Sequence, residues 1–228
     1  MNNLLQVESL NAFYGKSQIT FDINMNVQQG EVAVIVGRNG VGKTTTIKSI
    51  LGFVDKKDSK ILFKDIDITA IPPYKISKYG MTIVPDTGGV FHNLTVEDNF
   101  KLSQQNGYFT WDHIFELFPP IKNLLKRKGA KLSGGERKMV GISKGLLMNP
   151  DLLIIDEPSE GLAPFLVRDI ASTINRIEES ISIIVADQNL SFIMSIADKY
   201  YIMDGGSIQL SGGKDDIKKE DIEKYLAI

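Results

Sequence analysis

The chain has 228 residues, of which 43% are hydrophobic and 24% charged, and its formal net charge is −2. This is an ordinary globular composition, and a near-neutral charge gives no electrostatic footprint for a nucleic-acid partner. The absence of cysteine excludes disulfides, thiolate metal sites and cysteine nucleophiles, and two histidines, His92 and His113, make a histidine-rich metal site an unfavourable interpretation. No run approaches the roughly 18 apolar residues of a membrane-spanning helix, and no secretory signal opens the chain. We therefore expect a soluble intracellular protein that reaches a membrane only through partners.

Apolar runs predict the strands of a sheet that is buried on both faces. The β-branched run at 32–36 is followed by similar runs at 81–84, 152–155 and 181–186. Helical patterns lie between them, such as the apolar stripe at 166–177. Strands that alternate with helices indicate an α/β fold with a largely parallel sheet.

Two other stretches predict additions to this core. Residues 4–27 and 60–68 alternate apolar and polar residues, which favours a small antiparallel β layer. Residues 92–149 contain helical patterns and no convincing strand, so we expect an inserted helical subdomain at 87–149, with residues 1–86 and 150–228 forming the core. The mixed charged and apolar tail at 214–228 predicts a short amphipathic helix.

The strongest motif follows the first buried strand. Eight consecutive residues fit G-x-x-x-x-G-K-[ST], namely Gly37, Arg38, Asn39, Gly40, Val41, Gly42, Lys43 and Thr44. In such a loop the backbone N–H groups surround phosphate oxygens, Lys43 reaches the β- and γ-phosphates, and the Thr44 hydroxyl ligates Mg²⁺. A chance glycine-rich turn is disfavoured because a strand precedes the motif and a helix pattern follows it.

Two acids end a later buried strand. Asp156 follows the run at 152–155 and can hold Mg²⁺, and Glu157 is placed to polarise a water for attack on a γ-phosphate. Two acids after a strand are common on solvated loops. Together with the phosphate loop, however, they predict binding of ATP with Mg²⁺, and hydrolysis.

A serine–glycine turn precedes another helix pattern at Leu132–Glu136. Ser133 and Glu136 have the spacing of a capping box, which is a purely structural interpretation. Alternatively the serine hydroxyl, the N–H groups of Gly134 and Gly135 and the helix dipole form a second anion site. One nucleotide does not need two such sites within one chain, whereas two chains packed head to tail would use one from each.

With these motifs in order, the sequence resembles the ATP-binding cassette (ABC) ATPases over essentially its whole length. Leu132–Glu136 looks like their signature motif, with Glu136 in place of the commonest glutamine, and 159–163 resembles their D-loop. Tyr14 matches the aromatic residue that stacks on adenine, and a core tyrosine is the alternative. The resemblance implies a P-loop NTPase core with an antiparallel β layer and a helical subdomain.

Two departures from the commonest pattern point to a subgroup. Asp86 stands at the Q-loop position and Gln188 at the position of the switch histidine. The segments 84–86, 115–119, 158–164 and 187–189 look like those of branched-chain amino-acid importers. In that subgroup Asp86 and Asp187 replace more usual glutamates, and each side chain is shorter by one methylene.

The resemblance also implies a role for each residue. ATP binds Gly37–Thr45 with Tyr14 against the adenine, and Thr44 and Asp156 hold Mg²⁺ with Asp86 acting through water. Glu157 is the general base, and Gln188 contacts the γ-phosphate or the water. A glutamine cannot exchange a proton as histidine does, so its role is positional. Ser133, Gly134, Gly135 and Glu136 complete the ATP site of the opposite subunit.

The implied partners are permease transmembrane subunits, contacted near 86–99, a second ABC ATPase chain of the same or a related kind and, indirectly, an extracytoplasmic solute-binding protein. The chain would then be cytoplasmic and peripheral on the inner face of the cell membrane. A transporter of urea, amides or other solutes and a non-transport regulatory ATPase are the alternatives. A chromosome-maintenance head is disfavoured, because no long heptad pattern separates Thr44 from Asp156.

Overall fold

The computed structural model describes residues 3–227, and its central element is a six-stranded sheet in the order β12-β11-β4-β10-β9-β8. Strands β11, β4, β10, β9 and β8 are parallel, and β12 joins β11 in the antiparallel direction. The strands are β4 (Val32–Val36), β8 (Met81–Val84), β9 (Leu152–Asp156), β10 (Ser182–Asp187), β11 (Lys199–Asp204) and β12 (Ser207–Gly213). The four strands that the apolar runs predict are all present.

A second six-stranded sheet is antiparallel, and its central strand is β1 (Asn3–Tyr14), which pairs with most of the others. The other members are β2 (Ser17–Gln18), β3 (Ile23–Gln28), β5 (Asp55–Lys57), β6 (Lys60–Phe63) and β7 (Ile66–Asp67). Strand β6 buries Ile61 and Phe63 and exposes Lys60, as its alternating pattern predicts. The expected antiparallel layer is therefore confirmed.

The parallel sheet is buried because it separates two apolar clusters. Along β4 the side chains of Val32, Val34 and Val36 belong to the cluster on one face, and those of Ala33 and Ile35 to the cluster on the other. Successive strand residues point to opposite faces, so both sets must be apolar. This double burial explains the continuous apolar run at 32–36 and confirms the α/β fold class.

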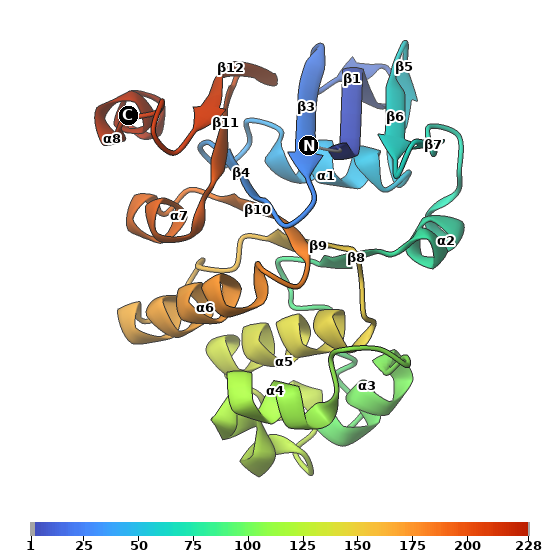
Figure 1. Ribbon diagram of the computed structural model, residues 1–228, viewed down its shortest axis with the longest axis vertical. Helices are drawn as coiled ribbons and strands as arrows, with labels where there is room; N and C mark the ends of the chain where they lie inside the picture. Colours follow the sequence, from blue (N-terminus) through green and yellow to red (C-terminus); the bar gives the residue numbers. More distant parts are fainter. Residues whose placement is uncertain (1–2, 228) are drawn as a thin grey trace.

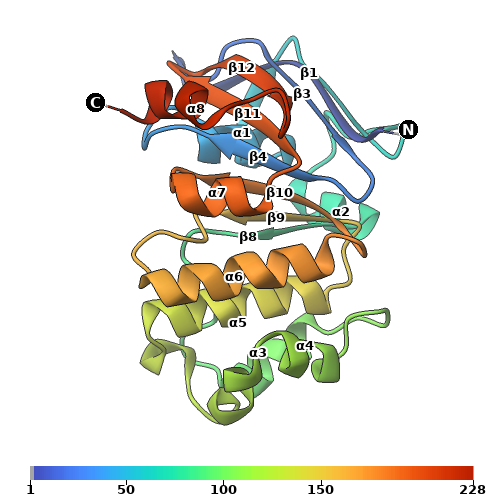
Figure 2. The ribbon, with the colours of Figure 1, turned by 60° about the vertical axis from the view of Figure 1, so that its left-hand side comes forward.

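The helices cover the sheet in layers. They are α1 (Lys43–Ile50), α2 (Pro73–Ile76), α3 (Val96–Ser103), α4 (Trp111–Leu117), α5 (Gly134–Leu147), α6 (Pro164–Ile177), α7 (Leu190–Ile196) and α8 (Lys219–Leu226), with short 3-10 helices at Ser77–Tyr79, Pro119–Leu124 and Gly129–Lys131. Figures 1 and 2 both show α5 and α6 beneath the parallel sheet and α3 and α4 beyond α5. Within residues 3–227, no helix has the length and apolar character needed to cross a bilayer.

The region 87–149 is helical, as expected. Its β pairing, among the residues described, is limited to an isolated bridge between Thr95 and Lys128. Phe100 and Ile114 belong to the same apolar cluster as Val34, so the packing between the helices and the sheet is continuous. The division into a core and a subdomain at these boundaries stays a prediction. The short tail helix is confirmed as α8, which buries Ile222.

The hairpin of β11 and β12 was not among the predicted elements. Gly205 and Gly206 form its turn and both have positive φ, at 52° and 81°. Two residues with φ above zero are typical of the tightest hairpin turns, and glycine adopts them without a steric penalty. The Gly-Gly pair after the apolar residues of β11 is thus a signal for this hairpin.

Helix α5 and the loop after β8 approach so closely that only glycine fits between them. A Cβ at Gly141 would lie 2.3 Å from the carbonyl oxygen of Gly88. We predict that Gly141→Ala lowers the free energy of unfolding by about 1–3 kcal/mol, because the loop must move away from the helix. Urea denaturation followed by circular dichroism measures this change.

Gly134→Ala on the same helix is the matched control, because a Cβ there meets nothing within 4 Å. Alanine is favoured over glycine mainly in a helix interior, so propensity alone would stabilise Gly141→Ala more than Gly134→Ala at the first helical position; a lower stability of Gly141→Ala is therefore due to the close contact. A Gly141→Ala chain as stable as the Gly134→Ala chain would contradict the packing described here.

Candidate functional site

The loop between β4 and α1 folds around the ammonium group of Lys43. The Lys43 side chain is 3% exposed, and its Nζ donates hydrogen bonds to the carbonyl oxygens of Gly37 at 2.8 Å and Arg38 at 3.0 Å. The same Nζ lies 3.6 Å from Oε1 of Glu157. Burial lowers the pKa of Lys43, and nearby carboxylates, that of Glu157 first, oppose this shift. The loop thus holds a buried cation at the carboxyl end of a parallel strand.

Glycines give this loop its shape. A Cβ at Gly37 would lie 2.6 Å from the carbonyl oxygen of Met203 and 2.7 Å from Cγ2 of Val41, so a larger residue cannot fit. Gly42 has a φ of 108° and directly precedes α1. The turn therefore depends on glycine at these two places, and it brings backbone N–H groups to a helix N-terminus, as an anion site requires.

Thr44 and Asp156 meet beside this loop. The Thr44 hydroxyl lies 2.9 Å and 3.1 Å from the two carboxylate oxygens of Asp156. Asp156 is 2% exposed; burial raises its pKa, and the hydrogen bond from Thr44 lowers it. Hydroxyl and carboxylate oxygens are the donors that Mg²⁺ prefers, and proteins supply it with only one or two carboxylates when phosphates complete its coordination. The donor set at this place therefore fits Mg²⁺.

Glu157 follows β9 in an uncommon backbone conformation. Its φ is 48°, in the left-handed region, and its N–H donates to the carbonyl oxygen of Ala186 at 2.8 Å. Burial, helped by the neighbouring Glu160 side chain, raises the pKa of Glu157 to about 7, and Lys43 opposes this shift. The carboxylate thus stands beside the buried cation of the phosphate loop.

Asp187 ends β10 and connects two loops. Its buried carboxylate accepts hydrogen bonds from the N–H and hydroxyl of Ser159, at 2.9 Å and 2.7 Å, and from the N–H groups of Gln188 and Asn189, at 2.7 Å and 2.8 Å. From the sequence, Asp187 is identified only as a replacement for a more usual glutamate of the importer subgroup. The contact with Ser159 is tertiary, and the sequence held no signal for it. Asp187 fixes the backbone of Gln188, whose side chain is exposed.

The serine–glycine turn lies at the N-terminus of α5. The Ser133 hydroxyl accepts from the N–H of Glu136 at 3.3 Å, and Oε2 of Glu136 accepts from the N–H of Ser133 at 2.8 Å, so the capping box is present. Glu136 also forms an ion pair with Arg127 at 2.9 Å. Among residues 3–227, no hydrogen bond or ion pair joins this turn to the phosphate loop. The two candidate anion sites are therefore not joined by direct polar contacts.

The remaining predicted site residues lie in different surroundings. Tyr14 is 51% exposed at the end of β1, so the alternative that it is a core tyrosine is wrong. Asp86 is exposed after β8, and its carboxylate accepts from the N–H of Thr87 at 2.8 Å. The Asp86 charge still contributes to the raised pKa of Asp156. Arg38, Asn39 and Gly40 are exposed on the phosphate loop, Val41 is partly buried and Thr45 is buried.

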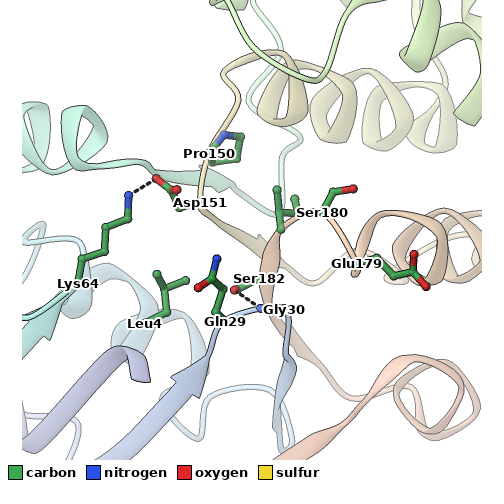
Figure 3. A pocket seen from close by; sticks show the side chains of 10 residues that line it. Leu4, Gln29, Gly30, Lys64, Pro150, Asp151, Glu179, Ser180 and Ser182 are labelled. Carbon is green, nitrogen blue, oxygen red and sulfur yellow. Dashed lines mark hydrogen bonds and ion pairs between the residues drawn. The ribbon is translucent and has the colours of Figure 1, made fainter. Parts of the chain in front are cut away.

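Two hollows lie at opposite ends of the parallel strands. One of about 110 Å³ is lined by residues of the phosphate loop together with Ile19 and Glu157. A larger one of about 400 Å³ lies at the amino ends of β4, β9 and β10 (Figure 3), where Lys64 reaches Asp151 and the Ser182 hydroxyl meets the Gly30 N–H. Ligands of α/β sheets bind outside the carboxyl ends of the strands, which favours the hollow at the phosphate loop.

Comparison with known proteins identifies the family. The family model for the ABC transporter matches residues 20–160. The branched-chain amino acid transport ATP-binding protein BraG of Pseudomonas aeruginosa is 30% identical over 90% of this chain and 91% of its own length. The probable branched-chain protein LivF of Archaeoglobus fulgidus is 30% identical over 97% of each chain. The lipopolysaccharide export protein LptB of Escherichia coli is 28% identical over 97% of this chain and 95% of its own.

Solved structures agree with these relatives. A nucleotide-free ATP-binding cassette from an ABC transporter matches with a TM-score of 0.84 and 26% identity, over 100% of this chain and 96% of that one. The ADP conformation of the cassette MJ1267 matches with a TM-score of 0.80 and 25% identity, again over 100% and 96%. The resemblance to ATP-binding subunits of the branched-chain type is confirmed. The chain belongs to the ABC transporter family, and it is an ATP-binding and ATP-hydrolysing cassette.

Proposed function

We propose that this ATPase powers an importer of branched-chain amino acids or similar small polar solutes. The observation that carries the proposal is the match at 30% identity to BraG and LivF across nearly the whole chain, together with Asp86 and Gln188 at the two positions that mark this subgroup. LptB, at 28% identity, is named for lipopolysaccharide export, so the transported compound needs a direct test.

ATP binds the phosphate loop in this proposal. The N–H groups of residues 37–45 and the Lys43 ammonium neutralise phosphate charge, and Lys43 is already held at the loop by two backbone carbonyls. The exposed ring of Tyr14 is free to stack on the adenine. Thr44 and Asp156 hold Mg²⁺, with Asp86 acting through water, and the bound ion supplies charge neutralisation to the phosphates.

Glu157 is the general base and orients the attacking water. Its carboxylate lies 3.6 Å from Lys43 Nζ, so it faces the place where a γ-phosphate reaches the lysine. Gln188 contacts the γ-phosphate or the water through its amide, and the Asp187 hydrogen bond to its N–H fixes its backbone. Phosphoryl transfer depends mainly on such positioning and on charge stabilisation.

A second cassette completes the site. Ser133 and Gly134 are exposed, and the Ser133 hydroxyl accepts a hydrogen bond within its cap while its own O–H remains able to donate to a phosphate. Gly135 adds an N–H group at the same helix N-terminus, and Glu136 holds the turn through the cap and Arg127. These residues would serve the ATP of the facing chain, which is either a second copy or a related ATPase.

The segment at 86–99 contacts the permease in this proposal. It contains Phe91, whose side chain is 55% exposed although large and apolar. A permease bound there would hold the cassette on the cytoplasmic face of the cell membrane, and an extracytoplasmic solute-binding protein would act on the other side. The helical region 87–149 would then move as a subdomain against the core at 1–86 and 150–228.

Glu157→Gln tests the catalytic role. We predict that this variant binds ATP as the unchanged chain does and that kcat falls by about 10²–10⁴-fold, because a neutral amide cannot take a proton from water. Steady-state phosphate release and a nucleotide-binding titration measure the two quantities. Glu179→Gln, at the opposite end of the strands, is the control. Hydrolysis at the normal rate by Glu157→Gln would remove Glu157 from the mechanism.

Lys43→Ala tests the phosphate loop. We predict that the Kd for ATP rises about tenfold or more, because a buried charge-assisted contact to phosphate is lost. Isothermal titration calorimetry gives the Kd. Lys48→Ala removes an exposed lysine of the same helix and should leave the Kd within about twofold of the starting value. Equal affinity in the Lys43→Ala chain would be inconsistent with the assigned loop.

Uptake by intact cells tests the transported compound. We predict that deletion of the coding sequence from its native host lowers high-affinity uptake of radiolabelled leucine, and that the unchanged gene restores uptake whereas the Glu157→Gln form does not. If leucine uptake persists while uptake of urea or an amide is lost, the substrate assignment is wrong and the transport role stands. Full uptake of every solute tested would oppose an importer.

A further inference from the structure

Helix α5 carries two buried lysines that sequence patterns did not single out. Lys138 and Lys144 are 8% and 9% exposed, and each donates to a backbone carbonyl oxygen at 2.5 Å, that of Glu157 and that of Gly89 respectively. A buried ammonium group is costly unless its donors and charge are matched. The burial of these two lysines therefore calls for an explanation, and the residue that accepts each hydrogen bond indicates where to look.

The acceptor of Lys138 is the residue with the unusual backbone. Glu157 has a φ of 48°, a left-handed conformation that is strained for a non-glycine residue and persists only where its surroundings impose it. Three hydrogen bonds hold its backbone. The N–H of Glu157 donates to the carbonyl oxygen of Ala186 of β10 at 2.8 Å, and its own carbonyl oxygen accepts from Lys138 of α5 at 2.5 Å and from the N–H of Glu160 at the longer distance of 3.4 Å. The backbone of Glu157 is thus fixed from the sheet on one side and from the helix on the other.

The carboxylates near Lys138 lie at the carboxyl ends of the parallel strands, where the phosphate loop also lies. Burial lowers the pKa of Lys138, and the nearby carboxylates of Asp86, Glu160, Asp187 and Glu157, that of Asp86 first, oppose this shift. Asp86 follows β8, Glu157 and Glu160 follow β9, and Asp187 ends β10, and these three strands are neighbours in the sheet. Lys138 is therefore a cation, supplied by a helix, that faces the acidic edge of the nucleotide site.

We infer that Lys138 is a positioning residue for hydrolysis, which holds Glu157 in its left-handed conformation so that its carboxylate faces Lys43. The inference rests on the proposed role of Glu157 as the general base. Lys138 lies five residues after Ser133, the N-cap of the same helix. In the proposed dimer α5 therefore connects two sites: its Ser133 turn contacts the ATP of the facing chain, and its Lys138 contacts Glu157, which acts on the ATP bound by the same chain. No contact of Lys138 with substrate is invoked.

The test compares matched variants of the full chain. Lys138→Met keeps the length of the side chain and removes the donor, and Lys144→Met makes the same change at the other buried lysine of α5. For Lys138→Met we expect kcat to fall at least about tenfold with the Kd for ATP within about twofold of the starting value, since small misplacements of a reacting group slow chemistry by up to about a hundredfold. Lys138→Arg, which can still donate, should recover most of kcat. Lys144→Met should keep kcat within about threefold.

Three results would overturn the inference: an unchanged kcat in Lys138→Met, an equal loss in Lys144→Met, or no recovery in Lys138→Arg. If Lys138→Met does not fold by circular dichroism, Lys138→Gln replaces it, because the shorter amide cannot reach the Glu157 carbonyl, and the same loss is expected.

Glu157→Gln separates this inference from the proposed function. In a Glu157→Gln background, adding Lys138→Met should cause little further loss, because both changes act through one group. A normal rate for Glu157→Gln would contradict the proposed base. A slow Glu157→Gln chain beside a normal Lys138→Met chain would contradict only the role of Lys138.

Discussion

The parallel direction of four neighbouring strands is the constraint on which this molecule depends. Strands that run the same way must end at the same edge of the sheet, so whatever follows them is brought together. Here β4 is followed by the phosphate loop and β8 by Asp86, while β9 and β10 end at Asp156 and Asp187. Segments more than a hundred residues apart in the chain thus meet because of strand direction alone. Apolar packing on both faces then keeps the strands in register.

This gathering concentrates negative charge, and the structure compensates for it from two sides. Asp156 and Asp187 are buried at the sheet edge, and Glu157 lies close beside them. Buried charges are tolerated where opposite charges and hydrogen bonds match them. Lys43 supplies one cation from the loop and Lys138 another from α5. The electrostatics of the site therefore depends on a helix that precedes β9 in the chain as well as on the phosphate loop.

The parts that could be predicted from the sequence are those with local causes. The run at 32–36 had to be a doubly buried strand, and the glycine spacing of the phosphate loop follows from close backbone contacts such as that of Gly37 with Met203. The parts that could not be predicted arise from tertiary contacts. No residue near Lys138 in the sequence indicates that its ammonium group will donate to the carbonyl oxygen of Glu157, 19 residues later in the chain. Likewise, the pairing of Asp187 with Ser159 appears only when two strands lie side by side.

The pairing of β4 has a consequence for how the chain is made. Its partners are β10 and β11, which begin at Ser182 and Lys199, whereas β1 finds β3 and β6 within the first third of the chain. A ribosome releases the amino-terminal end first, so the antiparallel layer can form early, while the strand that carries the phosphate loop waits for most of translation to finish. During that time five consecutive apolar residues have no neighbouring strand. The order of synthesis thus leaves this strand unpaired until the last fifth of the chain begins to emerge.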